Sequence, residues 1–420
     1  MNKSDKAALA PRLRFPEFVL TEEWQAYTLD KIADRLTEKV GDKQLTTLSI
    51  SAGVGFVSQA EKFSRDISGK QYDNYIFLQK GDFSYNKGNS KKFPQGCIYE
   101  LKEYDEAAVP NAFISFRFNK RYVSDFYKGY FENNFHGKQL IKFITSGARM
   151  DGLLNINPSD FFSIILPTPK NKAEQQKIAD CLSSIDDLIA AEDKKLETLR
   201  AHKKGLVQKL FPAEGKAVPE WRFPEFRSSG EWEEKLLAQV GDIITGNTPS
   251  TADVNNYGGN KMFVSPADMS ELKYVVETKT KLTEKGFSTT RKIPANSVLF
   301  VCIGSTIGKV AQNKCECATN QQINSVVPFE DYINDFIYYA LELNSSKISK
   351  LAGKQAVPII NKSLFSSVMI STTEYDEQQK IANCLSSIDD LISEQAKKIE
   401  ALKTHKKGLM QGLFPSIEEA

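Results

Sequence analysis

The chain has 420 residues, of which 41% are hydrophobic and 26% charged, and its formal net charge is +2. This length predicts two or three domains, and this composition is typical of a globular protein. The first residues lack the apolar core of a secretory signal, and no run reaches the roughly 18 apolar residues of a membrane span, so we expect a cytoplasmic protein.

The chain begins with a short motif that returns in its second half. RFPEF occupies 14–18 and again 222–226. A tryptophan follows six residues after each copy, at Trp24 and Trp232. This spacing predicts two tandem units that share a common frame.

Between the shared ends of the two units, residues 44–166 and residues 245–371 show no defensible alignment with each other. We call these two stretches the first and second inserts. Both combine β-branched and aromatic runs, which are typical of strands, with apolar residues at helical spacing. Strands are expected at 45–52, 75–79, 112–118, 161–166 and 297–303. Helices are expected at 124–134 and 334–344, and loops at 245–250 and 255–260. The predicted fold class of each insert is therefore α/β, with mixed helix and strand content.

A long helix is predicted to close each unit. Residues 174–212 and 377–415 share 28 identities in 39 positions, and Pro212 and Pro415 end both copies at the same place. Their apolar residues recur in alternating steps of four and three, a heptad seam that predicts pairing of the two helices. The predicted pairing residues are Ile178, Leu182, Ile185, Ile189, Leu196, Leu199, Leu206, Leu210, Ile381, Leu385, Ile388, Ile392, Ile399, Leu402, Leu409 and Leu413.

Charge predicts the direction of this pairing. Residues 174–193 hold six acidic side chains against one lysine, and residues 194–209 hold six basic ones against one glutamate. The second copy has the same polarity, so an antiparallel pair sets each acidic half beside a basic half. The polar seam residues, which cost stability but fix register, are Glu192, Lys203, Gln395 and Lys406. We expect two globular domains separated by a helix pair about 55 Å long, in pseudo-two-fold relation.

This pattern resembles the specificity subunit of type I restriction–modification enzymes. The resemblance is carried by RFPEF…W at the start of each unit and by the two EQQKIA…HKKGL-x-Q-x-LFP helices. Four stretches of the second insert are similar to target recognition domains of that family: TGNTPS (245–250), SVLFVCIGSTIGKV (297–310), ATNQQINSVVP (318–328) and GKQAVPIINKSLFSSVMI (353–370). The first insert departs from this pattern.

The resemblance implies a domain organisation and a set of partners. The domains would be 1–170 (first target recognition domain), 171–213 (central helix), 214–375 (second target recognition domain) and 376–420 (C-terminal helix). Each recognition domain would read one half of a bipartite, asymmetric site in double-stranded DNA. The helices would set the spacing between the halves and dock two methyltransferase subunits, which a restriction and translocase subunit would join. Partner subunits would use S-adenosylmethionine, ATP and magnesium, and this chain no cofactor.

DNA contact requires basic residues for phosphates and forked amides or guanidinium groups for base edges. In the second insert the candidates are Asn247, Thr248, Ser305, Thr306, Lys309, Asn320, Gln321, Gln322 and Lys354. In the first insert they are Tyr85, Asn86, Lys87, Asn89, Lys91, Lys92 and Arg149. The alternative for the amides is that they satisfy hydrogen bonds of the loop backbone, and for Arg149 a loop ion pair.

Signals for catalysis in the sequence are weak. GSTIGKV (304–310) has three residues between its glycines where a phosphate loop has four, so we expect a turn that contacts DNA or a plain hairpin turn. NPSD (157–160) lacks the second proline and the aromatic ring of adenine methyltransferases. Asp82 with Glu100 and Lys102 loosely resembles a metal-dependent nuclease site, and a nuclease is therefore one alternative function.

No metal site is expected either. Cys315 and Cys317 have the wrong spacing for the usual paired zinc motif, and no second pair follows. His202 and His405 match within the repeat without a nearby ligand, and His136 is interpreted as structural. We therefore predict a non-catalytic DNA-recognition subunit. A helical scaffold that binds only protein is the second alternative.

Overall fold

The computed structural model describes residues 9–88, 93–144, 154–353 and 357–415. It divides into two compact units: unit 1 comprises Met1–Ala190 with Glu400–Ala420, and unit 2 comprises Ala191–Ile399. Each long helix thus contributes to both units, and the four predicted domain ranges stay a prediction. Within the described part of the chain, no helix is both long and apolar enough to cross a membrane.

Unit 1 combines short strands and helices around a four-stranded sheet. Its strands are β1 (Gln25–Thr28), β2 (Ala33–Arg35), β3 (Leu48–Ser51), β4 (Gly55–Ser58), β5 (Ile76–Gln79), β6 (Phe83–Asn86), β7 (Cys97–Glu100), β8 (Glu106–Val109), β9 (Ile114–Phe118) and β10 (Ile165–Thr168). Its helices are α1 (Leu29–Ile32), α2 (Gln59–Phe63), α3 (Ser124–Glu132), α4 (Phe135–Leu140) and α5 (Pro158–Phe162). The main sheet has the order β2-β9-β6-β7 and is antiparallel throughout.

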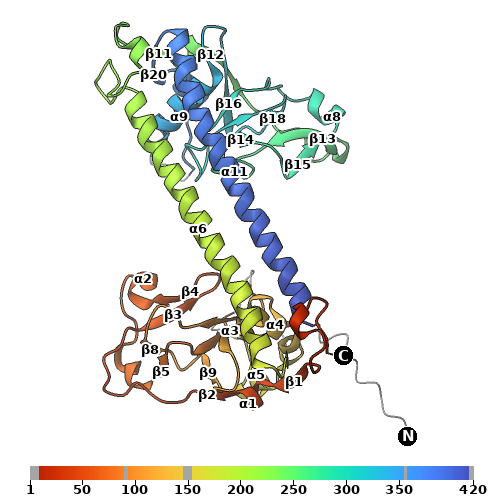
Figure 1. The fold of residues 1–420 in the computed structure, drawn as a ribbon. Coiled ribbons are helices and arrows are strands. Elements are labelled where there is room, and N and C mark those ends of the chain that lie inside the picture. Colours follow the sequence, from red (N-terminus) through yellow and green to blue (C-terminus); the bar gives the residue numbers. More distant parts are fainter. Residues whose placement is uncertain (1–8, 89–92, 145–153, 354–356, 416–420) are drawn as a thin grey trace. The chain divides into compact units, whose positions relative to one another are not determined.

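Unit 2 has a five-stranded main sheet. Its strands are β11 (Glu233–Leu236), β12 (Gly241–Thr245), β13 (Tyr257–Val264), β14 (Tyr274–Val275), β15 (Thr280–Leu282), β16 (Val298–Val301), β17 (Val310–Asn313), β18 (Ala318–Thr319), β19 (Ile323–Pro328) and β20 (Met369–Thr372). Its helices are α7 (Leu237–Val240), α8 (Glu284–Ser288), α9 (Asn334–Ser349) and α10 (Lys362–Ser366). The main sheet has the order β12-β19-β16-β17-β14, and β15-β13-β18 forms a small second sheet beside α8 (Figure 1).

The two inserts share one topology although their sequences do not align by eye. The order β2-β9-β6-β7 in unit 1 matches β12-β19-β16-β17 in unit 2. The short pair β1–β10 matches β11–β20, and both pairs are antiparallel. After β9 and after β19 comes a helix whose second and third residues are Asp-Phe, and the phenylalanines, Phe126 of α3 and Phe336 of α9, are fully buried. The inserts are therefore two versions of one domain.

One predicted strand is partly wrong. The sequence FFSIIL (161–166) predicts a strand, but its first two residues end helix α5 and only its last two lie in β10. The side chain of Asn157 accepts a hydrogen bond from the backbone N–H of Asp160, and Pro158 occupies the first helical turn. This cap and proline start a helix, and they override the strand preference of the aromatic residues.

The long helices, α6 (Lys172–Leu210) and α11 (Tyr375–Leu413), begin and end within two residues of the predicted bounds. In unit 2, Gln395 Nε2 donates a hydrogen bond to Glu192 Oε2 at 2.6 Å, and Lys203 Nζ lies 2.9 Å from Asp389 Oδ1. The later residue of α6 thus pairs with the earlier residue of α11. The helices are antiparallel, and the mixed fold class is confirmed as well.

The predicted pairing residues face inward along both helices. Buried are Ile178, Leu182, Leu210, Ile381, Leu385, Ile388, Ile392, Ile399 and Leu413, and half-buried are Ile185, Ile189, Leu196, Leu199, Leu206, Leu402 and Leu409. Leu182 and Leu413 belong to the hydrophobic core of unit 1, and Leu210 and Leu385 to that of unit 2. The ends of the seam therefore also build the domain cores.

Each core is completed by a phenylalanine that follows a long helix. In unit 1 the ring centroid of Phe414 lies 4.4 Å from that of Tyr130 in α3. In unit 2 the ring of Phe211 lies 5.0 Å from Phe336 in α9 and 5.6 Å from Trp232. The LFP motif of the second repeat thus completes the unit that contains the first insert, and the LFP motif of the first repeat completes the other unit.

Replacing Phe414 by alanine should therefore weaken the domain at the opposite end of the sequence. Loss of a buried phenylalanine costs about 3–5 kcal/mol. We expect Phe414→Ala to reduce amide protection in α3, measured by hydrogen-exchange mass spectrometry, and to leave α9 unchanged. Phe211→Ala is the matched control and should do the reverse. Equal loss of protection in both helices for either variant would contradict this prediction.

Candidate functional site

The repeated sequence motifs bind each other within each unit. Arg14 of RFPEF places Nε 2.7 Å from Oε1 and Nη2 2.8 Å from Oε2 of Glu174, at the start of EQQKIA. Arg222 and Glu377 form the same two bonds in unit 2, at 2.8 and 2.7 Å. Forked pairs of this kind are directional, so each unit's first motif is fixed to its closing helix. The sequence contained the signal, because both motifs recur together, but it did not identify them as partners.

In unit 2, four loops meet at one end of the main sheet. The backbone N–H of Gly246, after β12, donates to the carbonyl of Ile323 at the start of β19. The side-chain amide of Gln322 donates to the carbonyl of Ile303, in the turn after β16, at 3.2 Å. The N–H of Gly304 donates to the carbonyl of Pro358, which precedes α10, at 3.0 Å. The loops that carry the predicted motifs are therefore brought together.

Gly246 allows the closest of these approaches. A Cβ at this position would lie 2.2 Å from Thr319 Oγ1 and 2.3 Å from the carbonyl oxygen of Asn320. Any side chain larger than hydrogen would force the loop after β12 away from the loop before β19. The glycine of TGNTPS is thus explained by packing between loops.

Several candidate side chains in these loops bond to loop residues of this unit. Asn247 accepts from the N–H of Arg291 at 2.8 Å, and Asn320 Nδ2 donates to Gln322 Oε1 at 2.9 Å. Lys309 Nζ donates to the carbonyl of Met269 at 3.1 Å. These bonds match the alternative that the sequence left open, because they hold the loops in shape.

Other candidates point outward. Thr248, Gln321 and Ser305 are exposed, while Thr306 is half-buried. Thr248 Oγ1 donates to Gln321 Oε1 at 2.7 Å, a bond that occupies the oxygen of the amide and leaves its N–H groups for another acceptor. Lys354 lies outside the described residues. The exposed hydroxyls and amide form a polar surface with donors and acceptors of the kind that reads base edges.

In unit 1 the connection from β6 to β7 corresponds to the turn from β16 to β17. Asn86 and Lys87 are half-buried here, and Asn86 Oδ1 accepts from the N–H of Gly88 at 2.9 Å. The carbonyl of Lys87 accepts from the N–H of Leu154 at 2.9 Å, as the turn after β16 bonds to the segment before α10. Asn89, Lys91, Lys92 and Arg149 lie outside the described residues. The topology nevertheless gives both inserts the same position for their candidate loops.

Tyr85 differs from the other candidates because it lies in the core. Its side chain is fully buried, its ring stacks on Phe161 with centroids 4.7 Å apart, and its hydroxyl donates to the carbonyl of Gln95. Burial raises the pKa of Tyr85. The ring has no exposed surface to offer a base, so a contact with DNA would require it to leave the core.

The carboxylates that suggested a nuclease are already occupied. Asp82 is fully buried, and Arg117 holds both of its oxygens, with Nε 2.5 Å from Oδ1 and Nη2 2.8 Å from Oδ2. Burial raises the pKa of Glu100, and Lys102 lies 3.2 Å from its Oε2. In the described ranges, no group of three or more His, Cys, Asp or Glu side chains is placed to bind a metal. The guanidinium of Arg117 thus occupies the carboxylate oxygens that a nuclease would need to bind its metal ion.

His136 lies inside unit 1, as its structural interpretation implied. Its side chain is 2% exposed, with its ring centroid 6.2 Å from that of Tyr85 and 6.0 Å from that of Phe131. Burial lowers the pKa of His136 to about 4. The imidazole is therefore neutral near pH 7 and packs as a core side chain.

Comparison with known proteins identifies similar chains. Residues 229–404 match the type I restriction modification DNA specificity domain. The MjaIX specificity subunit of Methanocaldococcus jannaschii is 28% identical over 194 residues, 45% of this chain and 45% of that subunit. The protein described as the MjaX specificity subunit of the same organism is 26% identical over 339 residues, 80% of this chain and 77% of that protein. The chain thus matches less than half the length of the first relative and about three quarters of the second.

A solved structure has the same fold. The S subunit of a type I restriction-modification system from M. genitalium superposes with a TM-score of 0.60 and 15% sequence identity. The superposition covers 97% of this chain and 99% of that chain.

Acid should destabilise unit 1 through His136. Between pH 6.5 and 4 the unfolded histidine binds a proton that the buried one does not, so stability falls as the pH drops through this window. A shift from 6.5 to about 4 corresponds to about 3 kcal/mol. Hydrogen exchange of α3 and α4 at pH 7 and pH 4.5 would measure it. His136→Leu should show a smaller pH dependence than the unmodified chain; an equal dependence would contradict the prediction.

Proposed function

We propose that this chain, which belongs to the specificity subunits of type I restriction–modification systems, recognises DNA sequence through two domains, one in each unit. The observation that carries the proposal is the meeting of four loops at one end of the unit 2 sheet. These loops expose Thr248, Ser305 and Gln321, whose hydroxyls and amide can hydrogen-bond to base edges. All four loops lie within the matched residues 229–404.

Unit 1 is proposed to use the corresponding loops for a second half-site. Its sheet has the strand order of unit 2, whereas the loops carry unrelated residues. Two domains of one topology with different loops would read two different sequences. Together they would recognise a bipartite, asymmetric site in double-stranded DNA, and the helix pair would set the gap between its halves.

The helix pair is also proposed to dock two methyltransferase subunits. Leu188 and Leu391 hold matching positions in the repeat and are 43% and 51% exposed. Two identical partners require two equal contact surfaces, and an exposed leucine at the same place on each helix suits this requirement. A restriction subunit with translocase activity would complete the assembly. The partner subunits would use S-adenosylmethionine, ATP and magnesium.

The chain itself is proposed to be non-catalytic and free of cofactors. The nuclease alternative is disfavoured by the pairing of Asp82 with Arg117, because a carboxylate held at both oxygens by a guanidinium is a poor metal ligand. The scaffold alternative gives no reason for polar side chains to gather on the four loops.

Methylation mapping tests the proposal as a whole. Expressed with its methyltransferase subunit in a host that lacks adenine methylation, the chain should produce modified adenines in one two-part motif with a fixed gap. Long-read sequencing of the host genome would detect them. Absence of new methylation, although the two proteins assemble, would refute DNA reading and favour the scaffold.

A single side chain tests the proposed surface. Gln321→Ala should relax the preference at one base pair in one half-site by about 1–3 kcal/mol, roughly 5- to 150-fold, because one amide contact is lost. Binding of the methyltransferase complex to duplexes with single base-pair changes, at fixed salt, would measure it. Gln176→Ala, at an exposed position on α6, is the matched control and should leave every base preference unchanged. Unaltered preference in Gln321→Ala would remove Gln321 from the surface.

A further inference from the structure

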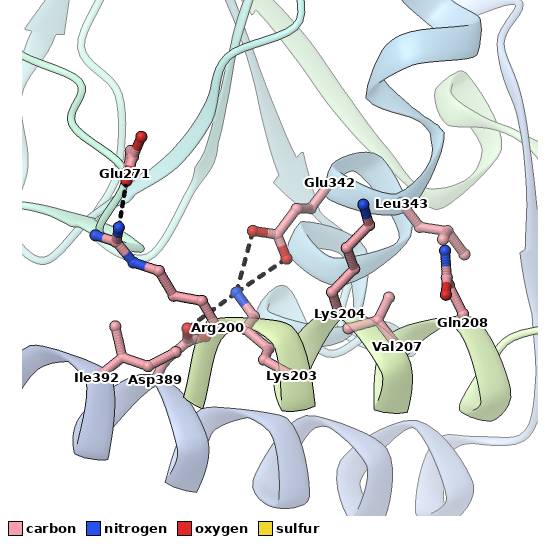
Figure 2. A pocket seen from close by; sticks show the side chains of 10 residues that line it. All are labelled: Arg200, Lys203, Lys204, Val207, Gln208, Glu271, Glu342, Leu343, Asp389 and Ile392. Atoms are coloured by element: carbon pink, nitrogen blue, oxygen red, sulfur yellow. Dashed lines mark hydrogen bonds and ion pairs between the residues drawn. The ribbon is translucent and has the colours of Figure 1, made fainter. Parts of the chain in front are cut away.

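In unit 2 a buried lysine joins three helices. The residue Lys203 is 8% exposed, and its Nζ lies 2.9 Å from both Asp389 Oδ1 and Glu342 Oε2. Figure 2 shows this ammonium between the two carboxylates, at the wall of a pocket of about 350 Å³. The hydroxyl of Tyr339 donates to Asp389 at 2.6 Å, and that of Tyr338 donates to Glu342 at 3.1 Å. One residue of α6 thus holds both α11 and α9.

Unit 1 contains the same arrangement, with the long helices exchanged. Lys406 of α11 places Nζ 2.6 Å from Asp186 Oδ1 in α6 and 2.6 Å from Glu132 Oε2 in α3. Lys128 adds a second cation, 3.0 Å from Asp186 and 3.2 Å from Glu132. Burial alone would raise the pKa of Asp186, but the hydrogen bonds from Lys406 and Lys128 keep it below its usual value. We call each set of one lysine, one aspartate and one glutamate a clamp.

The two clamps occupy equivalent positions. The two lysines stand 203 positions apart in the chain, and so do the two aspartates, which is the spacing of the long-helix repeat. The two glutamates each lie seven residues after the aspartate of the Asp-Phe pair in the first turn of α3 or α9. An ion network of the same composition therefore recurs in each unit at a place where both long helices and the insert helix meet. In unit 2, Lys203 and Asp389 are buried. In unit 1, the side chains of Asp186 and Glu132 are 32% and 33% exposed.

Stability alone does not account for such a network. For Lys203 and Asp389, which are buried, desolvation offsets most of the attraction. The half-exposed carboxylates of unit 1 are screened by solvent, so their ion pairs also contribute little net stability. A network in which one lysine bonds two carboxylates instead favours one geometry over its neighbours, because a small displacement breaks several charge-assisted bonds at once. The clamps are therefore suited to fixing orientation.

The orientation they fix is that of the main sheets. In unit 1, Tyr127 of α3 stacks on Phe118 of β9 with ring centroids 4.2 Å apart. In unit 2, Phe336 of α9 belongs to the same core cluster as Phe300 of β16 and Val326 of β19. In unit 2, β16 and β19 lead into the candidate loops. In unit 1, β9 pairs with β6, and the end of β6 leads into the candidate loop. A change in the position of α3 or α9 on the long helices therefore also shifts the loops of the same unit.

We propose that Lys406 and Lys203 are positioning residues for DNA reading, each aligning the loops of its own unit. The proposal rests on the proposed function and adds to it a separate determinant of specificity for each half-site, remote from the loops. Unit 2 has a further anchor on α9, because Lys273 Nζ lies 2.8 Å from both Asp335 and Ser386. Unit 1 is therefore the more sensitive test.

The experiment uses the complex of the full chain with its methyltransferase subunit. Binding is measured to duplexes that carry the methylated motif or a single base-pair change in either half. We expect Lys406→Met to lower discrimination in one half by roughly tenfold, about the effect of one misaligned base contact, and to leave the other half within about twofold. Lys203→Met should affect the opposite half, by a smaller factor.

The matched controls separate positioning from general damage. Lys407→Met removes the exposed neighbour of Lys406 and should change neither half, whereas Lys406→Arg keeps the charge and should largely restore discrimination. If Lys406→Met fails to fold, Asp186→Asn, which leaves Glu132 and Lys128 in place, should reduce discrimination in the same half to a lesser extent.

The possible failures can be distinguished. A complex of the unmodified chain that prefers no bipartite site overturns the proposed function, and the clamp proposal with it. Intact preference in the unmodified chain, together with no change or equal loss in both halves for folded Lys406→Met and Asp186→Asn, overturns the clamp proposal alone.

Discussion

Each domain core is closed by a phenylalanine that arrives from the end of a long helix, and the rest of the structure depends on this packing. A Cβ on Gly129 of α3 would lie 2.4 Å from the ring of Phe414, so the ring rests directly on the backbone of that helix. The N–H of Leu13 donates to the carbonyl of Gly412 at 2.8 Å and ties the first described residues to the same turn. The N-terminal insert therefore folds around the C-terminal end of the chain, and its core is incomplete without it.

This packing changes the explanation of the repeat. Identical docking surfaces for the two proposed partners would account for exposed matches such as Leu188 and Leu391, but many matches lie inside. The side-chain oxygens of Gln175 and Gln378 accept hydrogen bonds from the N–H groups that precede α3 and α9. The glutamates beside them hold the arginines of RFPEF. Most of the repeated helix residues thus make internal contacts, because two domains of the same topology need the same contacts with the long helices.

The sequence predicts the helices and strands of this structure better than it predicts which of them pack against one another. Heptad spacing and charge polarity are local, so the bounds and the antiparallel pairing of α6 and α11 follow from them. The common sheet order does not, because strand pairs such as β2–β9 join segments about 80 residues apart and leave no periodic trace. One sequence pattern does relate the two inserts. Asp-Phe, at Asp125 and Asp335, is followed by a glutamate seven residues after the aspartate, and this pattern aligns α3 with α9 although the surrounding residues differ.

The candidate loops show the same limit on a smaller scale. TGNTPS, the turn after β16 and ATNQQ converge, as expected for parts of one surface, but residue type alone does not separate readers from supports. Asn247, Asn320 and Gln321 are all amides that bond to loop residues, but the first two are half-buried while the third is exposed. The candidate Tyr85 is buried in the core, where its ring packs on Phe161. The solvent exposure of a polar side chain depends on which loop lies next to it, and the order of strands in the sheet determines which loops are neighbours.

A division of labour between loops and frame follows from these contacts. Gly246 and the amides of Asn320 and Gln322 hold the loops against one another through backbone atoms and short polar bonds. Exposed residues such as Gln321 and Ser305 contribute little to that scaffold, so their replacement alters the surface without disturbing the sheet. The clamps and the Arg–Glu pairs fix each domain to the long helices, and their residues are the same in both units. One frame can therefore carry two readers of different sequence, because the residues that determine what is read are separate from those that determine where the reader sits.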